Sequence, residues 1–172
     1  MNRAVFLDRD GVINFNEVRD GKPYAPRTLK EFAILPGVRE AIEAFRAAGY
    51  LVIVATNQPD IPPQVFEAMH AELRKKLPVD DIKVCPHRDA DQCDCRKPKP
   101  GMLLEAARER NIALEQSWMI GDRWRDVDAG KAAGCRTIFI DYNYPGEPRP
   151  RDPDHTVKSL PEAVPYVTGA PA

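Results

Sequence analysis

Residues 4–14 read Ala-Val-Phe-Leu-Asp-Arg-Asp-Gly-Val-Ile-Asn: an apolar run, two aspartates around an arginine, then a glycine. The run at residues 4–7 is typical of a strand buried on both faces of a parallel sheet, and Gly11 permits a sharp turn after it. Because side chains alternate along an extended chain, Asp8 and Asp10 can point into the same crevice. Two carboxylates at the end of a buried strand predict a ligand site there.

The rest of the chain alternates similar apolar runs with amphipathic segments. Strands are predicted at residues 51–55, 82–84, 118–120 and 137–140, and helices at 36–48, 65–77, 102–110 and 126–133. This alternation predicts an α/β fold: a single Rossmann-like domain over residues 1–168, with a central parallel sheet and helices on both faces. The spacing leaves no room for a cap domain. Residues 15–35 are expected to form a flap, 144–154 a proline-rich surface loop and 169–172 a tail.

Length and charge narrow the classes of function. The chain has 172 residues, with 25 Lys and Arg against 26 Asp and Glu and a net charge of −1. This balance excludes the broad basic surface that nucleic-acid binding requires. The longest apolar run is too short to cross a bilayer, and the N-terminus does not have the pattern of a signal peptide. We therefore expect a cytoplasmic monomer that recognises a small molecule, with neither nucleic acid nor membrane as a partner.

More polar side chains follow the second and fourth predicted strands: Thr56, Asn57, Gln58, Asp122 and Asp126. The carboxyl ends of parallel strands meet at one edge of a sheet, so these residues should lie near Asp8 and Asp10. Carboxylates crowded together repel one another, which makes a hard cation such as Mg²⁺ the expected occupant. The cation favours a phosphorylated substrate, for which one aspartate can act as nucleophile and another as acid and base.

Three cysteines and a histidine lie between residues 85 and 95: Cys85, His87, Cys93 and Cys95. Four such ligands suit tetrahedral zinc of the structural kind, because they leave no open position for a reactive water. A disulfide or free thiols are the alternatives, and the lack of a secretory signal favours zinc. The metal would fold this loop and hold Arg96 and Lys97 at the rim of the site. We expect Cys135 to be an ordinary buried thiol and His70 to be structural or exposed.

In content and order, these motifs resemble the four motifs of the haloacid dehalogenase superfamily of phosphohydrolases: Asp8-x-Asp10-Gly11, Thr56-Asn57, Lys97 in Arg-Lys-Pro-Lys-Pro, and Gly121-Asp122-x-x-x-Asp126. The resemblance implies that Asp8 is the nucleophile and Asp10 the acid and base. Lys97 would oppose the transferred charge. It also implies that Mg²⁺ binds Asp8, the backbone carbonyl of Asp10, and Asp122.

The resemblance assigns supporting roles as well. Thr56 and Asn57 would contact phosphate. Asp126 would order Lys97 or a water on the metal, or else be only an acidic residue in the first turn of a helix. A signalling receiver domain also uses an acidic pocket, Mg²⁺, a threonine and a lysine, but its phospho-accepting aspartate lacks a partner such as Asp10. A zinc-ribbon nucleic-acid binder is a third alternative, which the balanced charge disfavours.

Within the superfamily, the zinc loop and the absence of a cap narrow the choice. Asn14 and the stretch Pro100-Gly101-Met102 favour a resemblance to phosphatases that remove the 7-phosphate of heptose 1,7-bisphosphates. Histidinol-phosphate phosphatases share the zinc loop and are the alternative. A bisphosphate needs a second anion site, for which Arg96 is the first candidate and Arg123 the second. Flap cations at positions 19, 22 and 27 are further candidates. Residues 59–63 are Pro-Asp-Ile-Pro-Pro, whereas the heptose phosphatases commonly have Gly-Ile-Ala-Arg-Gly in this loop, so its substrate contacts should differ.

Overall fold

A six-stranded sheet in the order β5-β4-β1-β6-β7-β8 forms the centre of the computed structural model, which describes residues 1–171. All its neighbouring strands are parallel: β1 (Arg3–Leu7), β4 (Tyr50–Asn57), β5 (Asp81–Cys85), β6 (Trp118–Gly121), β7 (Arg136–Ile140) and β8 (His155–Val157). Each of the five strands predicted from the sequence is present. The predicted α/β class with a parallel sheet is confirmed.

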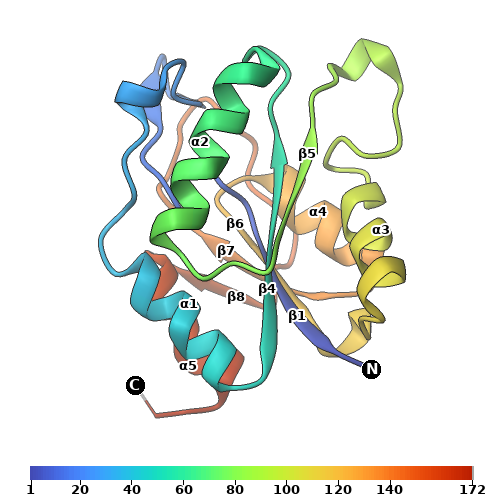
Figure 1. Ribbon diagram of the computed structural model, residues 1–172. Coiled ribbons are helices and arrows are strands. Elements are labelled where there is room, and N and C mark those ends of the chain that lie inside the picture. The colour runs from blue at the N-terminus through green and yellow to red at the C-terminus, as the bar shows by residue number, and fades with distance from the viewer. Residues whose placement is uncertain (172) are drawn as a thin grey trace.

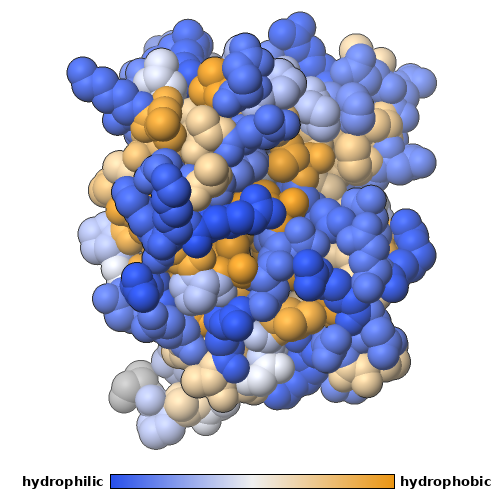
Figure 2. Space-filling model, viewed as in Figure 1, coloured by the Kyte–Doolittle hydropathy of each residue, from blue (hydrophilic) through white to orange (hydrophobic). Residues whose placement is uncertain are grey.

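Helices cover both faces of the sheet (Figure 1). One face carries α1 (Val38–Ala47), α2 (Pro63–Lys76) and α5 (Leu160–Thr168), and the other carries α3 (Gly101–Arg110) and α4 (Trp124–Ala133). Short 3-10 helices lie at Leu29–Glu31, Asp89–Asp91 and Leu114–Gln116. None of the helices within residues 1–171 is long and apolar enough to cross a membrane. The face seen in Figure 2 is mostly hydrophilic, with apolar side chains in small separate groups.

Alternate residues of β1 fill two separate cores. Val5 and Leu7 pack with α1, α2 and α5, whereas Ala4 and Phe6 pack with α3 and the end of α4. Strand β1 pairs with β4 on one side and β6 on the other, so it is buried on every side. The apolar run therefore ends in the middle of the sheet, and this places the aspartates after it at the centre of the sheet edge.

Three short strands differ from the sequence prediction. The flap contains an antiparallel hairpin of β2 (Glu17–Arg19) and β3 (Lys22–Tyr24), and the sixth strand of the sheet, β8, follows the proline-rich loop. Each has only three residues and no apolar run, so periodicity cannot reveal it. The Asp154 carboxylate holds β8 in place, because it accepts hydrogen bonds from the Thr137 backbone N (2.6 Å) and hydroxyl (3.1 Å). Of the predicted tail, residues 169–171 are exposed and residue 172 lies outside the described residues.

Candidate active site

A cavity of about 850 Å³ opens at the carboxyl ends of the central strands. Asp8 and Asp10 reach it after β1, Asn57 and Gln58 at the end of β4, and Asp126 from the first turn of α4. The predicted flap forms part of its wall, with residues 16, 22–25 and 27. The structure thus brings the separate motifs of the sequence to one edge of the sheet, as the parallel topology requires.

Lys97 is the cation at the base of the site. Its ammonium donates to Asp8 Oδ1 (2.8 Å), Asp126 Oδ1 (2.7 Å) and the carbonyl oxygen of Ala55 (2.7 Å), and the residue is only 2% exposed. Burial alone would lower the pKa of Lys97, but the carboxylates of Asp126 and Asp8 outweigh it and raise the pKa. The lysine therefore stays charged beside Asp8. The other oxygen of Asp126 accepts the backbone N–H of Arg123 at 3.0 Å, so one carboxylate both orders Lys97 and caps α4.

Asp122 follows strand β6 directly and is buried. Its Oδ2 accepts hydrogen bonds from the Tyr144 hydroxyl (2.7 Å) and the Asn16 amide (3.4 Å), whereas its Oδ1 is buried and accepts none. Gly11 has a φ of 86°, and a Cβ at this position would come within 2.1 Å of Asp122 Oδ2. The turn after β1 therefore needs glycine both for its backbone conformation and for the approach of Asp122.

The carboxylates of Asp8, Asp122 and Asp126 form a group whose ligand oxygens all lie within 4.8 Å of one another. Burial is the main cause that raises the pKa of both Asp8 and Asp122, and repulsion between the carboxylates raises both further. A divalent cation would relieve that repulsion and supply a partner for the unpaired Oδ1 of Asp122. The donor set consists of hard oxygens, so it fits a cation of the magnesium type.

The two predicted phosphate contacts at the end of β4, Thr56 and Asn57, have hydrogen-bond partners within the protein. Thr56 is fully buried and does not line the cavity; its hydroxyl accepts a hydrogen bond from Gln58 at 2.9 Å. Asn57 lines the cavity, but its amide binds the backbone of Lys97 in both directions, with N···O distances of 3.1 Å. Asn57 therefore connects β4 to the loop that carries the lysine.

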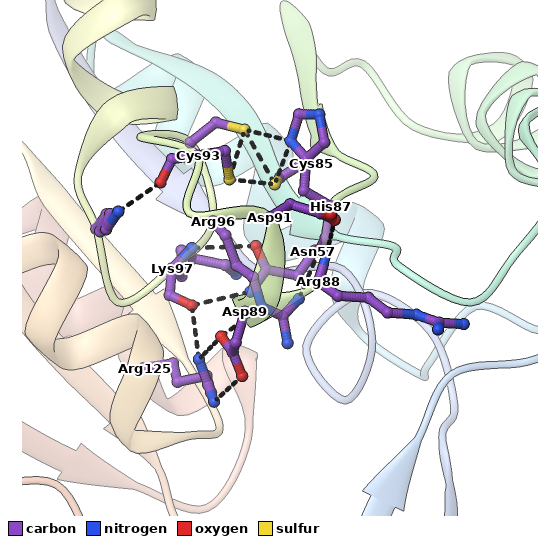
Figure 3. A network of polar contacts seen from close by, with 12 residues as sticks. Asn57, Cys85, His87, Arg88, Asp89, Asp91, Cys93, Arg96, Lys97 and Arg125 are labelled. Carbon is purple, nitrogen blue, oxygen red and sulfur yellow. Dashed lines mark hydrogen bonds and ion pairs between the residues drawn. The ribbon is translucent and has the colours of Figure 1, made fainter.

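Cys85, His87, Cys93 and Cys95 converge as a second candidate metal site, shown at the top of Figure 3. The Cys93 sulfur lies 3.6 Å from both Cys85 Sγ and Cys95 Sγ, and His87 Nδ1 lies 3.3 Å from Cys95 Sγ. These separations are close to the edges of a tetrahedron with metal–sulfur bonds of about 2.3 Å. Cys85 Sγ and Cys95 Sγ are 3.0 Å apart, far longer than a disulfide of about 2.05 Å, so these thiols are free. Cys135 is buried and does not belong to this group of ligands.

Asp89 connects the Cys/His loop to the rim of the cavity (Figure 3). Its carboxylate accepts from Arg96 Nε at 2.8 Å and from both terminal nitrogens of Arg125 at 3.1 Å. Hydrogen bonds from Arg96 and Arg125 lower the pKa of Asp89. Arg96 also donates to the carbonyl oxygen of His87 (3.2 Å), and Arg125 to that of Lys97 (3.2 Å). The loop, the two arginines and the lysine thus form one connected unit.

The other predicted anion sites differ in their pairing. Arg123 donates from Nη2 and Nε to the two carboxylate oxygens of Glu147, at 2.7 and 3.1 Å, and both residues line the cavity. Lys22 and Arg27 also line it, and their side chains have no ion-pair partner within residues 1–171. Arg19 does not line the cavity and instead stacks on the ring of Tyr24, 4.1 Å from its centroid.

Sequence reasoning missed four residues of the site: Asn16, Arg125, Tyr144 and Glu147. Arg125 lies between Asp122 and Asp126, so its nearness to the motif was a usable signal. Tyr144 and Glu147 belong to the proline-rich loop, whose composition predicts only an exposed connection. Nothing in the sequence indicates that this loop returns to the cavity, because the backbone contact responsible, Gly146 N to Gly21 O at 2.9 Å, joins distant segments.

The site combines Asp8 and Asp10 after the central strand β1, the buried Lys97, and Asp122 after the neighbouring strand β6. On a Rossmann-like sheet, this combination defines a site of the phosphohydrolase type. Residues 6–134 match the model of the haloacid dehalogenase-like hydrolases, and the chain belongs to this family. The relatives include the D-glycero-beta-D-manno-heptose-1,7-bisphosphate 7-phosphatase of Pseudomonas putida, 41% identical over 148 residues, which cover 80% of this chain and 82% of that protein. The enzyme of the same name from Pseudomonas aeruginosa is 40% identical over 151 residues, 81% of this chain and 82% of that protein.

Solved structures agree with these relatives. The crystal structure of D,D-heptose 1,7-bisphosphate phosphatase from B. bronchiseptica, complexed with magnesium and phosphate, matches with a TM-score of 0.80 and 28% identity. The match covers 97% of this chain and 98% of that one. The phosphatase of the same name from Burkholderia thailandensis matches with a TM-score of 0.65 and 25% identity over 95% of this chain and 96% of that one. The expected superfamily is confirmed, and the named relatives are phosphatases.

Proposed function

We propose that this protein is a Mg²⁺-dependent phosphatase that removes the 7-phosphate of D-glycero-D-manno-heptose 1,7-bisphosphate through an aspartyl-phosphate intermediate. The observation that carries the proposal is the contact of a buried lysine with Asp8, next to Asp10 and at the base of a cavity with cations on its rim. The names of the relatives at 36–41% identity support the substrate. In this proposal the enzyme works as a monomer in the cytoplasm, where its thiols stay reduced.

The residues divide the reaction into two steps. In the first, a carboxylate oxygen of Asp8 bonds to phosphorus, the bond from phosphorus to the leaving oxygen breaks, and Asp10 gives that oxygen a proton. In the second, water attacks phosphorus and gives a proton to Asp10, while the bond between Asp8 and phosphorus breaks. Lys97 keeps the Asp8 carboxylate in place and offsets the transferred negative charge. Mg²⁺, held by Asp8, the Asp10 carbonyl and Asp122, supplies further positive charge when bound.

We assign zinc to the Cys/His cluster, in a structural role. Four protein ligands leave no position for a substrate or a reactive water. The loop between Cys85 and Cys95 contains only the 3-10 helix Asp89–Asp91 and is mostly exposed. Such a loop cannot bury enough apolar surface to order itself, so a metal that links its two ends would fix it. Arg96 and Lys97 follow the loop directly, so a metal that orders the loop would also fix the positions of these two residues.

The second phosphate needs cations at the rim of the cavity. Arg96 remains the first candidate, because its guanidinium lines the cavity beside Lys97 and is held by Asp89. Lys22 and Arg27 of the flap have no ion-pair partner among the described residues, so they are available to an anion. Glu147 neutralises Arg123. A carboxylate on the wall, such as that of Glu147, favours the alternative substrate, histidinol phosphate, which carries a cationic amine.

Phosphate release from a substrate panel tests the proposal. The panel contains heptose 1,7-bisphosphate, fructose 1,6-bisphosphate, histidinol phosphate and p-nitrophenyl phosphate, each with Mg²⁺ and with a chelator, and Asp8→Asn serves as the inactive control. We expect kcat/KM for the heptose bisphosphate to exceed that for the monophosphates at least about tenfold, the value of one charge-assisted hydrogen bond. A preference of similar size for histidinol phosphate would replace the heptose assignment, and activity in Asp8→Asn would reject the mechanism.

A further inference from the structure

Arg9 lies between the two aspartates of the first motif, yet its side chain is completely buried. The guanidinium carbon lies 5.5 Å from the ring centroid of Phe32, and the side chain extends toward helix α2. A charged group without access to water needs a hydrogen-bond partner for each donor. The partners of Arg9 therefore show what the residue does for the site.

The Arg9 guanidinium joins Asp10 to a histidine on helix α2. Its Nε and Nη2 donate to Asp10 Oδ1, at 3.0 and 2.8 Å, and its Nη1 lies 3.1 Å from His70 Nε2. Arginine can only donate, so His70 Nε2 must accept, and the ring proton resides on Nδ1. His70 is 4% exposed, and burial together with the charge of Arg9 lowers its pKa to about 4. The ring is therefore neutral near pH 7 and remains an acceptor.

The two oxygens of Asp10 have different surroundings. Oδ1 accepts the two hydrogen bonds from Arg9 and a third from the Asn14 amide at 2.9 Å. Oδ2 accepts only one, from the Gln58 amide at 2.7 Å. A proton on Oδ1 would point at three N–H groups, whereas Oδ2 has a lone pair that accepts no hydrogen bond and can carry a proton. The exchangeable proton of Asp10 is therefore confined to Oδ2.

We propose that His70 is a positioning residue for the reaction. It accepts a hydrogen bond from Arg9, and Arg9 in turn fixes the orientation of Asp10 with Oδ2 toward the substrate. The inference rests on the acid and base role of Asp10 in the proposed function. In the first step the proton on Oδ2 passes to the leaving oxygen as Asp8 takes the phosphoryl group. In the second step Oδ2 recovers a proton from the attacking water as the bond from Asp8 to phosphorus breaks. Without His70, Arg9 would lose one buried partner and Asp10 its fixed orientation.

Aryl phosphates with different leaving groups test the proposal. The value of kcat/KM reports the first step, and phenol needs a proton in that step far more than p-nitrophenol does. We expect His70→Leu to lower kcat/KM for phenyl phosphate about tenfold more than for p-nitrophenyl phosphate, since general acid catalysis contributes roughly a hundredfold or more. His70→Gln, whose amide oxygen can accept from Arg9, should restore the ratio of the two values to within about threefold of the wild type.

Three variants complete the test. His70→Asn keeps a polar group too short to reach Arg9, so it should behave like His70→Leu and replaces that variant if the leucine protein does not fold. Leu73→Ala disturbs the buried face of the same helix and should lower thermal stability without changing the ratio. A wild-type ratio in His70→Leu or His70→Asn overturns the positioning role. A wild-type ratio in Asp10→Asn instead overturns the proposed acid and base function, so the two failures are distinguishable.

Discussion

The carboxylates of the site differ in what surrounds each oxygen. Asp8 shares an ammonium with Asp126, Asp10 accepts four N–H groups, and Asp122 keeps one buried oxygen without a donor. In the proposed reaction these differences suit separate tasks. The charge-balanced Asp8 suits attack on phosphorus, Asp10 is held in one orientation with a lone pair free on Oδ2 for proton exchange, and the unpaired oxygen of Asp122 suits a metal ion. In this proposal one residue type would perform three tasks, and exchanging each aspartate for asparagine should produce a different defect.

Asp8→Asn and Asp10→Asn should both be inactive toward sugar phosphates, but by different routes. Asp8→Asn lacks the nucleophile, so no phosphoenzyme should form and turnover should fall by more than roughly a thousandfold. Asp10→Asn keeps the nucleophile, so p-nitrophenyl phosphate should still phosphorylate it slowly, and the intermediate should accumulate because water is not activated. Acid quenching with labelled substrate measures both. Phosphoenzyme in Asp8→Asn would contradict the assignment.

Glu147→Gln should change substrate preference through Arg123. Removing the carboxylate leaves the guanidinium without its ionic partner at 2.7 Å, on the wall of the cavity. We expect KM for a sugar bisphosphate to fall about three- to tenfold, because Arg123 becomes free for a charge-assisted contact. The KM for p-nitrophenyl phosphate should stay nearly constant. Glu40→Gln, on the exposed side of α1, is the matched charge control. Weaker binding of the bisphosphate would mean that Glu147 aligns Arg123 for the substrate instead.

At the scale of the elements, we propose that the order of the Cys/His loop depends on a bound metal. Cys93→Ser should reduce zinc from about one per chain, and should lower the unfolding temperature and turnover together, since the loop leads directly into Arg96 and Lys97. Cys135→Ala removes a buried thiol outside the cluster and should keep its zinc. Elemental analysis with thermal unfolding provides the measurement. A Cys93→Ser protein with full activity and no zinc would show that the loop is ordered without metal.

Elements with their own apolar pattern could be predicted from the sequence, whereas those defined by a partner could not. The run at residues 4–7 is buried on both faces and must be a strand. The hairpin β2–β3 and strand β8 exist because of pairing, and β8 depends on the contact between Asp154 and Thr137. The same division applies to the site. Asp8 and Lys97 occur in motifs, but Glu147 and His70 reach the site through tertiary packing that no local pattern encodes.

At the scale of the whole molecule, the two cores meet at β1, so the strand that carries the proposed catalytic motif contributes side chains to both cores. Helix α2 contributes to one core through Met69 and Leu73, and to the site through His70. The stability of the fold and the order of the site are therefore coupled through this helix. The buried imidazole should make that coupling visible in the pH dependence of stability.

His70 should make the folded state less stable in mild acid. Its pKa is about 4 in the fold, lowered by burial, Arg9 and Arg74 against an opposing effect of Asp10, and 6.5 is its ordinary value. Between these values the unfolded chain binds a proton that the folded chain does not, so the free energy of unfolding falls as the pH drops from about 6.5 toward 4. The full loss in the free energy of unfolding is roughly 3 kcal/mol, because each unit of difference between the two pKa values is worth about 1.4 kcal/mol.

Urea unfolding of the wild type and His70→Gln between pH 7 and pH 4.5 checks this expectation. Asp89 and Asp141 have lowered pKa values, Asp8 and Asp122 raised ones, and both kinds change stability with pH in each protein. The difference between the two proteins cancels these contributions, because glutamine keeps the contact with Arg9 but cannot bind a proton. The wild type should therefore lose more stability on acidification than His70→Gln, by an amount that grows steadily below pH 6.5. Parallel curves would mean that the imidazole binds a proton as readily in the folded protein as in the unfolded chain, which would contradict the hydrogen bond from Arg9.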